Sequence, residues 1–203
     1  PIVHIIIYSF VFSYIFQLRS LPEFGETQFI IFMMIGYLPW IAFAEAISKS
    51  PNLLLEKAPL ITKVMFPVQL LPIVGTVIPY LTHVIGFGLL LIYLAIQGYV
   101  SILWLLLPII FFLQFLFTMG IVALLSAFCV FLRDLQQVVA LLVMIWFFLT
   151  PIIYPISLIE SEAVRNLFLL NPMHSFVSLY RDILLLESFS VVNLQIIIPV
   201  SLS

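Results

Sequence analysis

Charged side chains are scarce in this chain. Only 8% of its 203 residues are Asp, Glu, Lys or Arg, whereas a soluble globular domain carries about 25%. Because 65% of the residues are hydrophobic and the mean hydropathy is +1.32, the chain has too few charges to solvate a globule of 23.2 kDa. A water-soluble enzyme, a nucleic-acid-binding protein and a disordered segment are therefore excluded, and an integral membrane protein is predicted.

The few charged residues lie outside the long apolar runs. They form four clusters, at residues 19–26, 45–63, 133–134 and 160–187. The 69 residues between Lys63 and Arg133 carry no charge at all. Carriers driven by protons or ions generally hold ionisable side chains inside their spans, and here only Glu45 falls inside an expected span. We therefore expect any transport by this chain to be driven by a separate ATPase subunit.

The usual signatures of an enzyme are also lacking. There is no GxxxxGK[ST] sequence, so the chain is not expected to hold ATP or Mg²⁺ itself. His4, His83 and His174 have no second ligand three or four residues away, and no Ser-His-acid or Cys-His arrangement is recognisable. No metal site, bound cofactor or catalytic residue is therefore predicted. The single Cys129 excludes an internal disulfide.

Long apolar runs predict an all-α membrane protein with six transmembrane helices. A helix needs about 20 residues to cross the hydrocarbon core, and the runs are too long and unbroken for the alternating strands of a barrel. The expected spans cover residues 1–18, 28–46, 68–96, 102–132, 135–159 and 188–203. Since the first and last runs reach the ends of the sequence, we expect one membrane domain of a longer protein, truncated at both ends.

One polar segment is too short and too charged to span. Residues 48–67 contain all three lysines, and Ser50 followed by Pro51 is typical of a helix start. Pro59 would end that helix, so we expect about two helical turns over residues 50–58.

A second segment, residues 160–187, is amphipathic rather than spanning. Asn171 and Pro172 indicate the cap and first residue of a helix. His174 and Arg181 fall on one polar stripe of that helix. A helix of this kind lies at the interface or against protein and does not cross lipid alone.

The basic residues give weak support for a cytoplasmic N-terminus. In that orientation the inner loops carry four basic residues and the outer loops three, in the direction of the positive-inside rule. The inner residues are Lys49, Lys57, Lys63 and Arg133.

Aromatic residues make up 15% of the chain, and many lie near expected span ends. Tyr and Trp at such positions are typical of anchoring at the membrane–water interface. The alternative is a conduit whose aromatic faces stack on the apolar faces of sugars. Trp146 and Phe147 lie deep in the fifth expected span, where anchoring does not explain them, although ordinary packing does. The conduit candidates are Tyr8, Phe12, Trp146, Phe147 and Tyr154.

Short motifs in a characteristic order extend this interpretation. They are GYLPW at 36–40, KVMFP at 63–67, LP at 71–72, FLRDL at 131–135, TPIIY at 150–154, NP at 171–172 and YR at 180–181. In their order and spacing they resemble the membrane subunits of bacterial type-2 ABC exporters of lipid-linked polysaccharide, meaning O-antigen, capsule or teichoic-acid precursors. The resemblance covers essentially the whole chain.

The resemblance implies a permease without a P-loop, in a homodimer that carries two cytoplasmic ATPase subunits holding ATP and Mg²⁺. It further implies a location in the bacterial cytoplasmic membrane, with several spans and the N-terminus inside. The short helix would be the coupling helix that docks on the ATPase. Its candidate docking residues are Ser50, Leu53, Leu54, Leu55, Glu56 and Lys57.

The resemblance also implies re-entrant helices on the outer side, over residues 160–187, with His174, Tyr180 and Arg181 as the residues of interest. The first and fifth spans would form a lateral gate for the lipid and line the sugar conduit. The bilayer and a lipid-linked glycan are thus the expected partners, and nucleic acid is not.

Two other functions stay open at this stage. One is an ABC exporter of drugs or simple lipids with the same fold. The other is a multispan membrane glycosyl or acyl transferase, for which His174, Arg181 and Asp182 are the only candidate cluster.

Overall fold

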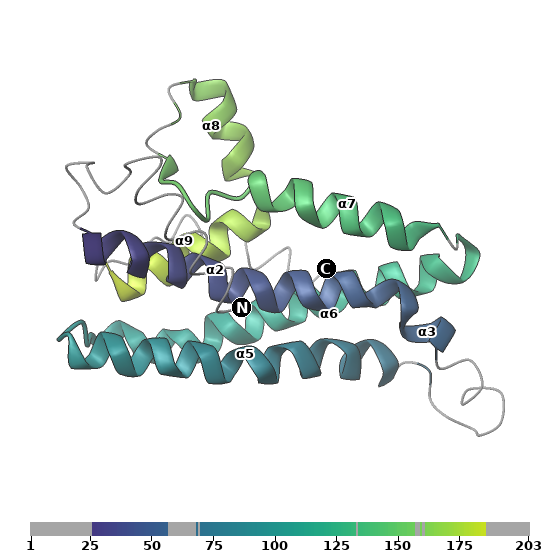
Figure 1. Cartoon of the computed structure of the whole chain (residues 1–203), viewed down its shortest axis with the longest axis horizontal. Coiled ribbons are helices and arrows are strands. Elements are labelled where there is room, and N and C mark those ends of the chain that lie inside the picture. Colours follow the sequence, from purple (N-terminus) through teal and green to yellow (C-terminus); the bar gives the residue numbers. More distant parts are fainter. Residues whose placement is uncertain are drawn as a thin grey trace.

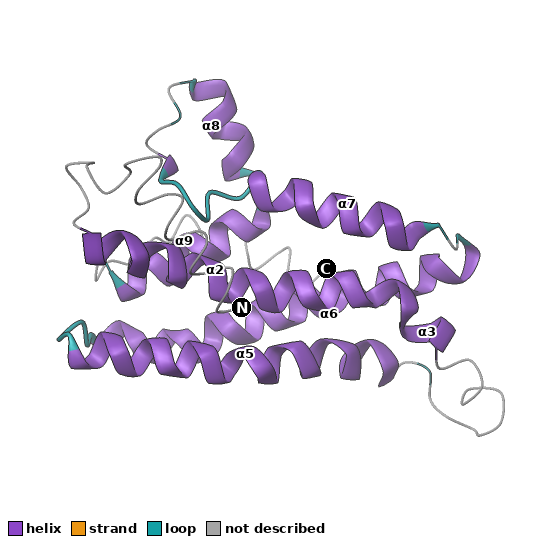
Figure 2. Cartoon of the chain, viewed as in Figure 1, coloured by secondary structure: helices purple, strands orange, loops and turns teal. Residues whose placement is uncertain are grey.

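The computed structural model describes residues 26–56, 68, 70–132, 134–156, 159 and 161–185 (Figure 1). All regular secondary structure within these ranges is helical, without any strand (Figure 2). The predicted all-α class is therefore confirmed for the described part. The first and sixth expected spans, residues 1–18 and 188–203, lie outside it, so the count of six spans stays a prediction.

Three described helices are long and apolar enough to cross a bilayer. They are α2 (Glu26–Lys49), α5 (Leu70–Ile96) and α6 (Leu107–Phe131), which continues from the short helix η4 (Ile102–Leu106). Each has 24 residues or more, whereas about 20 suffice to span the hydrocarbon core. The chain is therefore a multi-pass membrane protein.

The central helix of the bundle is α2. In its most hydrophobic part 72% of the residues are buried, against 33% in α5 and in the η4–α6 helix. The side chains that α5 and α6 expose are large and apolar, such as Ile85, Leu89 and Phe112. Such a surface suits contact with acyl chains, because lipid tails impose no cost on exposed apolar groups.

The helix α7 (Leu135–Phe148) is shorter than the fifth span expected over residues 135–159. Its 14 residues extend about 21 Å, less than the hydrocarbon thickness of about 30 Å. Pro151 accounts for the early end, because it has no N–H to continue the helix and disfavours helical conformation in the residue before it. The chain over residues 149–155 is irregular.

Two more helices occupy the amphipathic segment, α8 (Glu162–Leu169) and α9 (Pro172–Leu184). The predicted cap is confirmed, since Asn171 Oδ1 accepts the Met173 backbone N–H at 3.0 Å. Almost all of α9 is buried against α2 and α6, whereas α8 is exposed along most of its length. Whether these helices are re-entrant stays a prediction.

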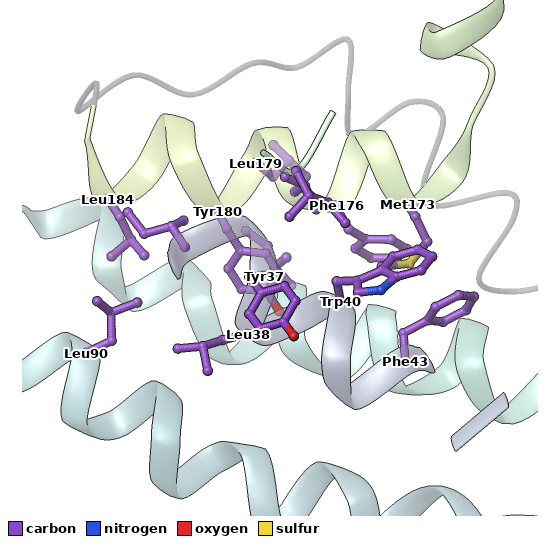
Figure 3. Close-up of a cluster of buried hydrophobic side chains, with 14 of the residues drawn as sticks. Tyr37, Leu38, Trp40, Phe43, Leu90, Met173, Phe176, Leu179, Tyr180 and Leu184 are labelled. Carbon is purple, nitrogen blue, oxygen red and sulfur yellow. The ribbon is translucent and has the colours of Figure 1, made fainter. Parts of the chain in front are cut away.

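An aromatic core forms where α9 packs against α2 and α6 (Figure 3). The Phe43 ring of α2 stacks on the Phe117 ring of α6, with centroids 5.9 Å apart. Phe117 in turn meets Phe176 of α9 at 5.7 Å. These contacts fix α9 inside the bundle instead of at its surface.

Helix α2 leads directly into η3 (Ser50–Asn52) and α3 (Leu53–Glu56). These helices lie within the short helix predicted over residues 50–58. Figure 1 shows α3 at one end of the bundle, the end at which α6 connects to α7.

Candidate functional site

The junction between α2 and α3 is held from inside the bundle. Ser50 is fully buried, and its Oγ donates a hydrogen bond of 2.7 Å to the Ile47 carbonyl in the last turn of α2. The bond satisfies one of the carbonyls that a helix end leaves without a partner. Ser50 therefore stabilises the junction between the two helices.

The Leu53 side chain of α3 packs against α5 at Gly75, a residue that has no side chain of its own. A Cβ built on Gly75 would be 2.5 Å from Leu53 Cδ1 and 2.8 Å from its Cδ2. The neighbouring Leu54 borders a groove of about 410 Å³ between α3, α5 and α6. Two of the predicted docking residues, Ser50 and Leu53, thus contact this chain itself.

The other docking candidates are less closely defined. Leu55 and Glu56 belong to α3, but their side chains are outside the described part, as is the whole of Lys57. The docking role of the six candidates stays a prediction.

Glu45 binds basic side chains near the same end of α2. Its Oε1 accepts a hydrogen bond from Lys49 Nζ one turn later, and its Oε2 lies 3.1 Å from His83 Nε2 of α5. These contacts compensate for placing a carboxylate in a largely apolar environment. The sequence pointed to Glu45 but not to His83 as its partner, because the two are 38 positions apart and share no motif.

Side chains of the irregular segment after α7 donate hydrogen bonds to backbone carbonyls at the end of that helix. Thr150 Oγ1 donates to the Trp146 carbonyl at 2.9 Å, and the Tyr154 hydroxyl donates to the Phe148 carbonyl at 2.8 Å. Within a membrane such carbonyls need partners from the protein, because lipid offers none.

Asn171 joins the end of α7 to the start of α9. Its Nδ2 donates to the Leu149 carbonyl at 3.0 Å and to Thr150 Oγ1 at 2.9 Å. Its Oδ1 accepts the Trp146 indole N–H at 2.8 Å in addition to the capped Met173 N–H. One side-chain amide therefore satisfies groups on both helices, of which the sequence predicted only the cap.

Arg181, three turns along α9, holds the next residues of the same irregular segment. Its Nη1 donates to the Pro151 carbonyl at 2.7 Å and its Nη2 to the Ile152 carbonyl at 2.6 Å. Its Nε donates to the Phe32 carbonyl of α2 at 3.3 Å, and the guanidinium lies 3.5 Å from the Phe32 ring centroid, a cation–π contact. Burial lowers the pKa of Arg181 to about 9, so the side chain is still charged at neutral pH.

Gly36 provides the space that Arg181 occupies. A Cβ at Gly36 would lie 2.7 Å from Arg181 Nη2 and 3.1 Å from Val177 Cγ1. The sequence named Gly36 and Arg181 in two separate motifs, and the structure brings them together.

A buried chain of hydrogen bonds links α9, α6 and α2. The Tyr180 hydroxyl donates to Gln114 Oε1 at 3.0 Å, and Gln114 Nε2 donates to the Pro39 carbonyl at 2.9 Å. Nothing in the sequence singled out Gln114, because a lone uncharged amide in an apolar run forms no pattern.

His174 is buried near the start of α9, and its Nδ1 has no hydrogen-bond partner among the described residues. Burial, with the positive charge of Arg181, lowers the pKa of His174 to about 4, so the imidazole is neutral. The Arg181 guanidinium donates hydrogen bonds to three backbone carbonyls. Within the cluster considered for a transferase, the positive charge of Arg181 is therefore used to hold the fold together. No group of three His, Cys, Asp or Glu that could hold a metal occurs in the described part of the chain.

The aromatic conduit candidates border different spaces. Trp146 lines an almost wholly apolar cleft of about 570 Å³ between α6, α7 and α8, whereas Phe147 lines a groove of about 420 Å³ between α2 and α7. Tyr154 packs on Phe168 of α8, with ring centroids 6.5 Å apart. Tyr8 and Phe12 lie outside the described residues, so the conduit as a set stays a prediction.

The groove between α2 and α7 combines aromatic faces with polar groups. It is lined by Tyr37, Trp40, Phe147 and Phe148 and by the polar residues Glu45 and Ser48. The Trp40 and Phe147 ring centroids lie 5.7 Å apart, so these rings pack on each other. Tyr37 and Trp40 are buried, so the aromatic faces open to the groove are those of Phe147 and Phe148. These faces can stack on the apolar faces of sugar rings, while Glu45 and Ser48 can hydrogen-bond sugar hydroxyls. The sequence pointed to Tyr37 and Trp40 as part of a motif and as aromatic residues near a span end, and did not predict that they share a groove with α7.

Comparison with known proteins places this arrangement in a family. Residues 1–185 match the family model described as ABC-2 type transporter. The O-antigen export system permease protein RfbA of Myxococcus xanthus is 34% identical over 189 residues, which cover 90% of this chain and 69% of the relative. Two proteins of the same name from Klebsiella pneumoniae are 27% and 28% identical over 185 residues, with the same coverage. The chain belongs to the ABC-2 type transporter family.

Proposed function

We propose that this chain is the membrane permease of an ATP-driven exporter that moves lipid-linked polysaccharide, of the O-antigen type, across the bacterial cytoplasmic membrane. The observation that carries the proposal is the match to permeases named for O-antigen export over 90% of the chain. As a membrane subunit without a P-loop, the chain is a transport component and not an ATPase. Capsule and teichoic-acid precursors are related substrates with the same lipid-plus-glycan chemistry.

The assembly proposed for this activity contains two copies of the permease and two cytoplasmic ATPase subunits, which hold ATP and Mg²⁺. The N-terminus and α3 lie on the cytoplasmic side. Support comes from α3 and the α6–α7 turn lying at the same end of the bundle (Figure 1), because the inner basic residues of the sequence fall in or beside these two connections. At the other side, α8 and α9 form the re-entrant region.

The groove between α2 and α7 is the proposed wall of the glycan path. Phe148 tests this directly, since it lines the groove and is 58% exposed. Phe112 on the outer face of α6 is also 58% exposed and serves as the matched control. We expect Phe148→Ala to lower export about fivefold, equivalent to the roughly 1 kcal/mol of an aromatic contact, and Phe112→Ala to leave export unchanged. Equal export in the two variants would remove the groove from the path.

The apolar cleft beside Trp146 is the proposed lateral site for the lipid part of the substrate. Its lining comes from α6, α7 and α8 and contains almost no polar surface. An acyl or prenyl chain matches that chemistry, whereas a glycan would lose the hydrogen bonds of its hydroxyls there.

The test of the function is depletion of the permease in its own bacterium. We expect surface polysaccharide to disappear while the undecorated lipid-linked glycan accumulates on the cytoplasmic side. Normal surface polysaccharide with altered drug resistance or lipid distribution would favour an exporter of drugs or simple lipids. Polymer that is absent from both sides, with glycosyl or acyl transfer by the purified chain without ATPase, would identify a transferase.

A further inference from the structure

We propose that Leu53 and Gly75 are the positioning pair through which α3 acts on α5. The proposal rests on the function above, in which α3 receives the movement of the ATPase. It concerns residues inside the permease, and not the surface at which the ATPase binds.

The contact is close and lies at one defined point of α5. Leu53 occupies the space in which Gly75 would have a side chain, with 2.5 Å between its Cδ1 and a Cβ built on Gly75. Real Cβ contacts are never this short, so the leucine depends on a glycine at this position. Because the nearest atoms belong to the tip of a leucine side chain, an alanine at position 75 would displace Leu53 without requiring α5 to unfold.

Gly75 is also the point at which the hydrogen-bond ladder of α5 is interrupted. Pro79 lies four residues later and has no N–H to donate to the Gly75 carbonyl. A proline at this spacing removes one rung and crowds the carbonyl, which is where a long helix bends. Leu53 therefore contacts α5 at the turn in which Pro79 removes one backbone hydrogen bond.

On its other side α3 has room to move. Leu54 borders the groove of about 410 Å³, whose α6 wall consists largely of small residues, with Gly120, Ala123 and Ala127 among them. At its start α3 is firmly joined to α2 through the buried Ser50. Although η3 and α3 also contact α6, the closest approach of α3 to another helix in the described part of the chain is that of Leu53 to Gly75 on α5. We therefore expect a displacement of α3 to act on α5 at this point.

The experiment uses the full-length permease with its partner ATPase in proteoliposomes or in the native strain. Three quantities are compared: retention of the ATPase on purification, ATP hydrolysis, and polysaccharide exported per ATP. We expect Gly75→Ala to retain the ATPase and its hydrolysis while export per ATP falls about tenfold, within the range of coupling effects, and Leu53→Ala to lower export per ATP by a similar factor. The control is Gly88→Ala on the same helix, since a Cβ there meets nothing within 4 Å.

The double variant Leu53→Ala, Gly75→Ala tests whether export depends on the contact between α3 and α5 or on the leucine and glycine side chains themselves. The new methyl group at position 75 extends into the space that the leucine leaves, so we expect export per ATP above that of Leu53→Ala. If one single variant fails to accumulate in the membrane, the other variant and the double variant decide the question.

The outcomes distinguish this inference from the proposed function. If the wild-type complex exports no polysaccharide, the proposed function fails. If the wild type exports and both single variants match it, the positioning pair is wrong while the function stands. Loss of ATPase binding in Leu53→Ala would also overturn the inference, because it would make Leu53 part of the docking surface.

Discussion

The two short helices that flank the long spans differ in how far polar contacts add to apolar packing. Helix α9 is held by its buried apolar face and, in addition, by hydrogen bonds from Asn171 and Arg181 to carbonyls after α7 and from Arg181 to α2. Helix α3 meets α5 through the fit of one leucine against one glycine. Hydrogen bonds have a fixed length and direction, whereas an apolar contact is non-directional. The contrast indicates that α9 is rigidly attached, here called the rigid bracket, and that the contact of α3 with α5 is able to shift.

The largest effect on this contrast is expected from Arg181→Met. The change leaves the carbonyls of Pro151 and Ile152 without their donor, at about 1–3 kcal/mol for each unsatisfied group, while the Phe32 carbonyl keeps its hydrogen bond within α2. We expect a loss of about 4 kcal/mol of unfolding free energy, measured by thermal unfolding of the purified complex. Arg165→Met is the control, because Arg165 lies on the exposed α8. Similar stability in the two variants would contradict the rigid bracket.

A smaller effect is expected from Gly36→Ala, which leaves the arginine in place and removes its space. The new Cβ would lie 2.7 Å from Arg181 Nη2, so the guanidinium must withdraw from its carbonyls, at about 2 kcal/mol. The control is Gly86→Ala, whose Cβ would make an ordinary contact of 3.6 Å and should stabilise the helix by about 0.5–1 kcal/mol. In the same unfolding assay, we expect Gly36→Ala to lower the unfolding free energy and Gly86→Ala to raise it. Changes of the same sign would contradict the role of Gly36 in making room for Arg181.

Asn171→Ala is expected to cost about 1–2 kcal/mol, the range of a lost helix cap. It also leaves the Trp146 indole N–H without its acceptor. Asn171→Asp retains the acceptor oxygen and loses the amide donor to the Leu149 carbonyl, so an intermediate stability is expected. An aspartate variant no better than alanine would show that the donor side of the amide dominates.

The smallest effect is expected at α3. Leu54 borders an open groove, so Leu54→Ala should change the unfolding free energy by less than about 1 kcal/mol. The same assay sharpens the comparison, because a change as large as that of Arg181→Met would mean that α3 is as firmly packed as α9.

Much of the architecture was predictable from the sequence. The apolar runs predicted α2, α5 and the η4–α6 helix because their length has one physical meaning in a membrane. Asn171-Pro172 predicted a helix start because capping is a local property. Ser50-Pro51 marked the start of η3, but the expected cap was wrong, since the Ser50 hydroxyl donates back to the Ile47 carbonyl at the end of α2. Hydropathy extended the fifth expected span past Phe148, where α7 ends, since Ile152 and Ile153 are apolar whether or not they are helical.

The site was less predictable, because its contacts join residues that are far apart. Arg181 was expected on a polar stripe, yet it is buried against carbonyls of residues 32, 151 and 152. Leu53 was expected on the surface of a docking helix, and it lies against Gly75. A single sequence records the residue types at both ends of such contacts but not the pairing, which depends on how the helices pack.

The carbonyl-bound charge of Arg181 also sets an order of assembly. An arginine cannot be buried before its acceptors are in place, because an unpaired charge in an apolar medium is too costly. Its acceptors lie on α2 and just after α7, both earlier in the chain than α9. During biosynthesis α9 is therefore expected to enter the bundle only after α2 and the segment that follows α7 have inserted and packed.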